Sequence, residues 1–124
     1  MIFGIGIDLV EIERVRKLLE KPNLTRLFSK EEISYAESKG SPATSLAGCF
    51  AAKEAVLKAL GTGFFCMGWR DVEVVHNEKG QPLVILSGQA EVFAAENKLT
   101  KIHLSISHDQ TKATAMAVAE KAGD

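Results

Sequence analysis

Three charged side chains in this sequence have the types and spacing that a metal and phosphate site requires. Glu54 and Lys58 are four residues apart, so a helix would bring both onto one face. Asp8 follows Gly4 and Gly6 at alternate positions of an apolar segment, so a strand would leave its carboxylate beside glycines alone. One or two carboxylates, completed by water and substrate phosphates, are a usual Mg²⁺ site, and Asp8 with Glu54 is the obvious pair. The plainer alternatives are a solvated ion pair on the helix and an aspartate that caps the helix after its strand.

A second polar group comes near the end of the sequence, in residues 105–109 (SISHD). Alternation puts Ser105 and Ser107 on one side of a strand, with His108 at its end. His108 would suit a phosphate or ribose contact, although a structural histidine is the plainer interpretation. A Ser/His/Asp hydrolase is poorly supported, because no nucleophile elbow surrounds these serines.

Glycines follow directly after the segment that carries Glu54 and Lys58. Residues 61–63 (GTG) are first of all a helix C-cap. Their flexible backbone also makes Gly61 and Gly63 candidate contacts for a cofactor. Because the C-terminal end of a helix dipole repels anions, Lys58 would have to offset that repulsion.

Length and composition limit the protein classes that remain. A chain of 124 residues, 46% hydrophobic and 25% charged, predicts one domain over residues 1–124. Its start has no basic leader and no apolar run long enough to span a bilayer, so we expect a cytoplasmic protein without a membrane segment. Cys49 and Cys66 match no zinc or thioredoxin spacing. The net charge of −1 argues against a general nucleic-acid binder.

The charge is nevertheless unevenly distributed along the chain. Between Glu11 and Lys30 there are six basic and three acidic residues, a local excess of three positive charges. An acidic partner could bind there. The basic residues are Arg14, Arg16, Lys17, Lys21, Arg26 and Lys30.

Periodicity and capping signals predict the elements that position these residues, and the spacing of Ser29 and Glu32 predicts a capping box at the start of the second helix. In chain order they are a strand (2–10), three helices (about 11–20, 30–38 and 42–60), a hairpin (69–76 and 82–87), a helix (88–98) and two strands (101–108 and 112–120). The order β-α-α-α-β-β-α-β-β favours an α+β domain with a largely antiparallel sheet. It lacks the regular βαβ alternation of a dinucleotide-binding fold.

The expected faces of two elements bear on the site. Alternation in the first strand puts four apolar residues on one face, opposite the glycines and Asp8: Phe3, Ile5, Ile7 and Leu9. On the third helix, Leu46, Phe50, Leu57 and Leu60 form a predicted core stripe. Glu54 and Lys58 then lie beside Ala47 and Ala51, and such small neighbours would leave room for a ligand.

Four segments together resemble the holo-[acyl-carrier-protein] synthase family of 4'-phosphopantetheinyl transferases. They are GIGIDLVEIERV at 4–15, FSKEE at 28–32, AGCFAAKEAVLKALGTG at 47–63 and LSISHD at 104–109. An opening G-I-D, a K-E-A-x-x-K-A-x-G-T-G helix and a late S-x-S-H in this order form a specific set. The resemblance extends over the whole chain.

The resemblance implies a fold, an activity and a site. It implies a 4'-phosphopantetheinyl transferase-like fold and a homotrimer with active sites between adjacent subunits. Mg²⁺ would be held by Asp8 and Glu54, and coenzyme A would lie near Lys58 and His108. The reaction would transfer the 4'-phosphopantetheine group from coenzyme A to a serine of apo acyl carrier protein in fatty acid biosynthesis, releasing 3',5'-ADP. The first helix would meet this acidic carrier, with expected contacts at Arg14, Leu18, Arg26 and Phe28.

The sequence departs from the family pattern at one position. Cys49 stands where family members commonly carry an arginine, which would offer phosphate or carrier-protein contacts that a thiol cannot replace. We therefore expect weakened or rerouted binding with the chemistry retained. The rival hypotheses are a non-catalytic coenzyme A or nucleotide-binding module and a small oligomeric scaffold.

Overall fold

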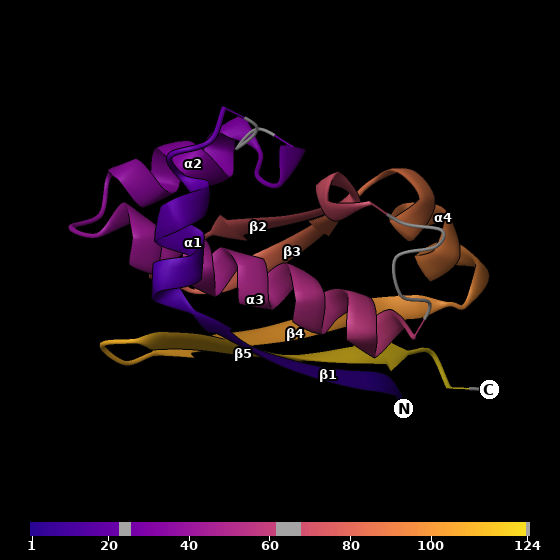
Figure 1. The fold of residues 1–124 in the computed structure, drawn as a ribbon. Helices are drawn as coiled ribbons and strands as arrows, with labels where there is room; N and C mark the ends of the chain where they lie inside the picture. The colour runs from indigo at the N-terminus through magenta and orange to yellow at the C-terminus, as the bar shows by residue number, and fades with distance from the viewer. Residues whose placement is uncertain (23–25, 62–67, 124) are drawn as a thin grey trace.

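The computed structural model describes residues 1–22, 26–61 and 68–123 of the protein. In these ranges the helices and strands follow the predicted order (Figure 1). They are β1 (Ile2–Glu11), α1 (Ile12–Leu18), α2 (Lys30–Glu37), α3 (Pro42–Leu60), the 3-10 helix η2 (Trp69–Asp71), β2 (Val72–His76), β3 (Pro82–Leu86), α4 (Gly88–Glu96), β4 (Leu99–His108) and β5 (Lys112–Lys121).

The described strands form two antiparallel sheets. β1, β5 and β4 make a three-stranded sheet in that order, and β2 pairs with β3 alone. α3 runs along the three-stranded sheet, with α1 and α2 at one end of the molecule and α4 at the other (Figure 1). The predicted α+β class and the antiparallel direction are confirmed, and the division of the described strands between two sheets is a feature that the sequence did not indicate. Alternation along a strand indicates its two faces and does not identify its neighbours.

Local capping chemistry sets the ends of α2 and α3. The Ser29 side chain accepts a hydrogen bond from the Glu32 N–H, and the Glu32 carboxylate accepts one from the Ser29 N–H. This is the predicted capping box. α3 begins after Ser41, whose hydroxyl accepts from the Thr44 N–H, and ends at Gly61 with φ of 81°. Both ends of α3 lie where the sequence predicted them.

β1 and α3 are in direct backbone contact at two glycines. A Cβ on Gly4 would lie 2.0 Å from the Ala59 carbonyl oxygen, and a Cβ on Gly6 would lie 1.9 Å from the Ala55 carbonyl oxygen. The glycines therefore make room for a helix. The expectation that the space beside them serves a ligand was wrong, because α3 fills it.

The opposite face of β1 points away from the core. Ile5, Ile7 and Leu9 are between 60% and 63% exposed, whereas Gly6 and Val10 are buried. Phe3 leaves this row at a register shift between Ile2 and Gly4, and packs edge-on against Phe93 of α4. In the single chain, the apolar side of the strand is thus the solvent side.

α3 supplies most of the core through small side chains. Ala47, Ala51 and Ala55 are fully buried, as are Leu46, Leu57 and Leu60 of the predicted stripe, while Phe50 is half-buried. The expectation that Ala47 and Ala51 leave space for a ligand was wrong. No helix in the described residues is long and apolar enough to span a membrane.

Candidate active site

Asp8 and Lys58 meet across the contact between β1 and α3. The Lys58 Nζ lies 3.1 Å from Asp8 Oδ1 and also donates to the Ile7 carbonyl oxygen at 3.1 Å. The Lys58 side chain is 53% exposed and that of Asp8 is 18% exposed. The ammonium group therefore contacts a largely buried carboxylate and is itself exposed to solvent, where a substrate can approach.

Glu54 completes this group. Burial and the negative charge of Asp8 raise the pKa of the Glu54 carboxyl, while Lys58 and Arg14 act in the opposite direction. Two carboxylates repel each other in this half-buried place, and a divalent cation bound between them would relieve that repulsion. No group of three or more potential metal ligands occurs in the described part of the chain. The donor set fits Mg²⁺, which commonly keeps water and substrate oxygens as its remaining ligands.

His108 lies in a different place, at the wall of a cavity of about 290 Å³. The cavity is bounded by α2, the first half of α3, the β2–β3 turn and the end of β4. Its lining comprises Glu32, Tyr35, Ala36, Thr44, Ser45, Gly48, Cys49, Val74, His76, Gly80, Pro82, Ile106 and His108. Asp8, Glu54 and Lys58 are absent from the lining, so one chain presents the predicted site as two separate parts.

Two aromatic rings form one wall of the cavity. Tyr35 and His76 stack with ring centroids 3.9 Å apart and planes 3° from parallel. The Lys39 Nζ lies 4.9 Å from the centre of the Tyr35 ring. Burial, with a smaller effect of the Lys39 charge, lowers the pKa of His76. Sequence reasoning missed this pair, because the two residues come from separate elements.

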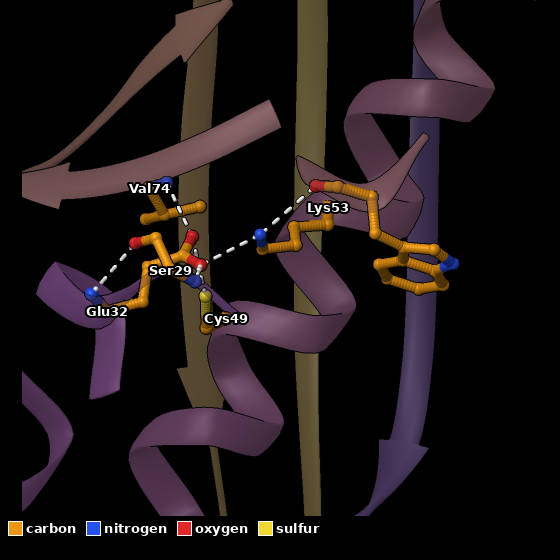
Figure 2. Close-up of polar contacts among 6 residues, drawn as sticks. Ser29, Glu32, Cys49, Lys53 and Val74 are labelled. Carbon is orange, nitrogen blue, oxygen red and sulfur yellow. Dashed lines mark hydrogen bonds and ion pairs between the residues drawn. The ribbon is translucent and has the colours of Figure 1, made fainter. Parts of the chain in front are cut away.

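Cys49 lies inside a polar cluster at the cavity wall (Figure 2). Its Sγ donates to Glu32 Oε2 at 3.2 Å. Burial and the nearby Glu32 carboxylate raise the pKa of the Cys49 thiol, which is therefore held as a neutral S–H donor. Glu32 also pairs with Lys53, and neither residue was a candidate in the sequence. The capping-box motif identified Glu32 only as a helix cap.

The residues expected to bind a carrier protein have different exposures. Arg14 and Arg26 are exposed and Leu18 is half-buried. Phe28 is 0% exposed and packs in the core beneath Lys53. The expectation that Phe28 contacts a partner was wrong, because an aromatic ring beside the apolar core is more stable inside it.

Of the two glycines expected to contact a cofactor after α3, the structure describes only Gly61. Gly61 has open space around its Cα and adopts the left-handed conformation of a helix C-cap. This confirms its structural role. Gly63 and Cys66 lie outside the described residues.

Comparison with known proteins identifies the family. The profile of the 4'-phosphopantetheinyl transferase superfamily matches residues 4–119. A holo-[acyl-carrier-protein] synthase of Clostridium novyi is 50% identical over 122 residues, covering 97% of this chain and 88% of that protein. The crystal structure of the Neisseria meningitidis holo-[acyl-carrier-protein] synthase superposes with a TM-score of 0.87 at 33% identity, covering 98% of this chain and all of the other.

A ligand-bound structure extends the comparison. The Bacillus anthracis holo-(acyl-carrier-protein) synthase in complex with CoA (3',5'-ADP) has a TM-score of 0.81 and 38% identity, covering 98% of this chain and 99% of the other. Sequence and fold thus agree over nearly the whole length. The chain belongs to the holo-[acyl-carrier-protein] synthase family of the 4'-phosphopantetheinyl transferase superfamily.

Proposed function

We propose that this enzyme transfers the 4'-phosphopantetheine group from coenzyme A to a serine of apo acyl carrier protein and releases 3',5'-ADP. We assign the reaction to fatty acid biosynthesis in the cytoplasm. The observation that carries the proposal is the contact of Lys58 with Asp8, with Glu54 in the field of both. A charged group of this kind serves phosphoryl-type transfer, where positioning and charge stabilisation dominate.

Each residue has a defined task in this reaction. Asp8 and Glu54 would hold Mg²⁺, which supplies positive charge at the pyrophosphate when bound. Lys58 would neutralise the charge that develops on the leaving phosphate, since its ammonium group reaches solvent beside Asp8. The serine oxygen forms a bond to the β-phosphorus as the bond to the 3',5'-ADP oxygen breaks. Glu54 is our candidate for the group that accepts the serine proton, because its carboxylate lies in the charged group formed with Asp8 and Lys58.

The cavity would take the nucleotide end of coenzyme A. His108 lies in its wall, and the Tyr35–His76 stack offers a flat aromatic surface. The crystal structure of the B. anthracis relative is a complex with CoA (3',5'-ADP). We infer from the separation of this cavity from Asp8 that the complete site uses the cavity of one subunit and the carboxylates of the next.

A homotrimer would bring the two parts together. β1 is an edge strand, and its outward row of Ile5, Ile7 and Leu9 is exposed with Met116 of β5 on the same face. An apolar edge of this length favours association with another chain. The exposed basic residues on and after α1 would bind the acidic carrier protein, with Arg14 also near Glu54.

A direct assay tests the proposal. The protein is mixed with apo acyl carrier protein, coenzyme A and Mg²⁺, and mass spectrometry of the carrier protein measures the mass added by the 4'-phosphopantetheine arm. Asp8→Asn and Glu54→Gln should each reduce transfer at least about 100-fold and alter the Mg²⁺ requirement while the protein stays folded. Full activity at unchanged Mg²⁺ dependence in either variant would refute the metal assignment. Coenzyme A binding without transfer by the wild type would favour the non-catalytic module, and no binding would favour the scaffold.

A further inference from the structure

Glu32 and Lys53 are the charged residues that the described part of the chain buries most completely. Both side chains are 1% exposed, and the Lys53 Nζ lies 2.8 Å from Glu32 Oε1 (Figure 2). Burying two charges costs several kcal/mol per ion before their attraction is counted. Apolar residues of similar size would often stabilise a fold as well. The pair therefore invites an explanation beyond stability.

Glu32 accepts hydrogen bonds from three different elements. At its Oε1, the Ser29 N–H at the start of α2 donates at 2.7 Å, beside Lys53 of α3. At its Oε2, the Val74 N–H of β2 donates at 2.8 Å and the Cys49 Sγ of α3 at 3.2 Å. One carboxylate thus fixes α2, α3 and β2 relative to one another. The same three elements contribute residues to the walls of the 290 Å³ cavity.

Lys53 adds a fourth element. Its Nζ donates to the Trp69 carbonyl oxygen of η2 at 3.1 Å, and the Trp69 ring packs on Phe50 of α3 with centroids 4.6 Å apart. Lys53 also neutralises Glu32, which lines the cavity. Without the lysine, an uncompensated carboxylate would repel any phosphate bound there.

We propose that Glu32 and Lys53 are positioning residues that set the affinity for coenzyme A by holding the cavity walls together and by cancelling the charge at its wall. This inference rests on the proposed function. The carboxylate site is fixed independently, because Gly4 and Gly6 hold β1 against α3. Loss of the pair should therefore change the KM for coenzyme A far more than kcat.

Two single variants separate geometry from charge. Lys53→Met keeps most of the side-chain length but leaves the Glu32 carboxylate without its cation. Glu32→Gln weakens the hydrogen bonds of the cluster and leaves the Lys53 ammonium group without its anion. Lys53→Met should raise the KM for coenzyme A about 10- to 100-fold, and Glu32→Gln should raise it less, each with kcat within about threefold. The double variant, which combines Glu32→Gln with Lys53→Met, should have a KM for coenzyme A between those of the wild type and Lys53→Met, since it leaves no unpaired charge.

The controls exclude a purely structural role. Lys101→Met removes an exposed lysine, and Val15→Ala weakens the core at a residue that does not line the cavity. Both should leave the KM for coenzyme A unchanged at a temperature where circular dichroism shows every variant folded. Should Lys53→Met fail to fold, the double variant and Glu32→Gln carry the test.

The outcomes separate this inference from the proposed function. An unchanged KM for coenzyme A in folded Lys53→Met overturns the positioning role. If Lys53→Met does not fold, an unchanged KM in both Glu32→Gln and the folded double variant overturns it. A fall in kcat at unchanged KM overturns it too. If the wild type transfers no arm, the proposed function fails. Calorimetric titration with 3',5'-ADP then still tests the pair, because a Kd equal to that of the wild type refutes it.

Discussion

At the scale of single residues, the Lys58–Asp8 contact controls the charge of the candidate metal site. Lys58 partly offsets the repulsion between Asp8 and Glu54, but burial and Asp8 still raise the pKa of Glu54. The Lys58 side chain is half exposed, so its pair with Asp8 contributes at most about 1 kcal/mol to stability. Its charge is thus available for a substrate without a large cost to the fold.

Lys58 and Arg14 should affect different kinetic parameters. Lys58→Ala removes the cation from the leaving phosphate, so kcat should fall about 100-fold or more with little change in the KM for carrier protein. Arg14→Ala should instead raise that KM and make binding less sensitive to salt, because Arg14 lies on the exposed basic surface. Steady-state kinetics at two salt concentrations measures both. Equal effects of the two variants on both parameters would contradict this division of roles.

His76 should make stability fall in mild acid. Because burial lowers its pKa in the folded protein, the unfolded chain binds the proton first as the pH falls. The contribution of neutral His76 to stability is complete above the pKa of the unfolded chain, about 6.5. It is lost as the pH falls through the lower pKa that His76 has in the folded protein. His76→Phe keeps an aromatic ring against Tyr35, and urea unfolding between pH 7.5 and 5 should show a smaller loss of stability than in the wild type. Parallel losses in the two proteins would contradict the prediction.

At the scale of elements, the contact of β1 with α3 determines where the carboxylates lie. Asp8 belongs to the strand face that carries Gly4 and Gly6, and Glu54 belongs to the helix that these glycines admit. Backbone contact brings the two elements closer than any side chain between them would allow. The glycines thus position the site although they do not line it.

Gly6→Ala should disturb this contact. The added methyl group would lie 1.9 Å from the Ala55 carbonyl oxygen, so strand and helix must separate. We expect a loss of about 3 kcal/mol or more in the free energy of unfolding, together with weakened Mg²⁺-dependent transfer. Gly40→Ala is the matched control, because a Cβ there meets nothing within 4 Å. Equal unfolding midpoints in urea for the two variants would show that the close approach is unimportant.

At the scale of the whole molecule, the single chain holds its two groups of candidate residues apart, beside an exposed apolar surface. The cavity with His108 lies apart from Asp8, and the outer row of β1 is uncovered. Assembly would bury the apolar row and join the two parts. Ile7→Lys should therefore reduce both the mass measured by light scattering and the activity, whereas Leu83→Lys on β3 serves as a control for added charge.

Mixed assemblies test whether sites are shared. Asp8→Asn and His108→Ala subunits should each be weakly active alone. When the two are co-expressed, random trimers would restore about one quarter of the sites, because each complete site needs one intact part from each neighbour. Activity well above the sum of the separate variants is expected. No recovery in trimers that mass spectrometry shows to be mixed would confine the site to one chain.

The sequence by itself determined the order of the elements, the ends of α2 and α3, and the candidate residues Asp8, Glu54 and Lys58. These features depend on local rules, such as the capping box at Ser29 and the helical spacing of Glu54 and Lys58. Whole-chain resemblance then indicated the family. Local patterns suffice for such features because the interacting residues are neighbours in the chain.

Only the tertiary structure decided which faces are covered and which distant residues meet. The apolar face of β1 proved to be the outer one, Phe28 proved to be core, and the space beside Gly6 proved to hold α3. The cluster of Glu32, Cys49 and Lys53 joins residues from separate helices, and no periodicity along the chain encodes such a contact. Burial and pairing depend on how elements pack in three dimensions, because the same alternating strand can turn either face toward the core.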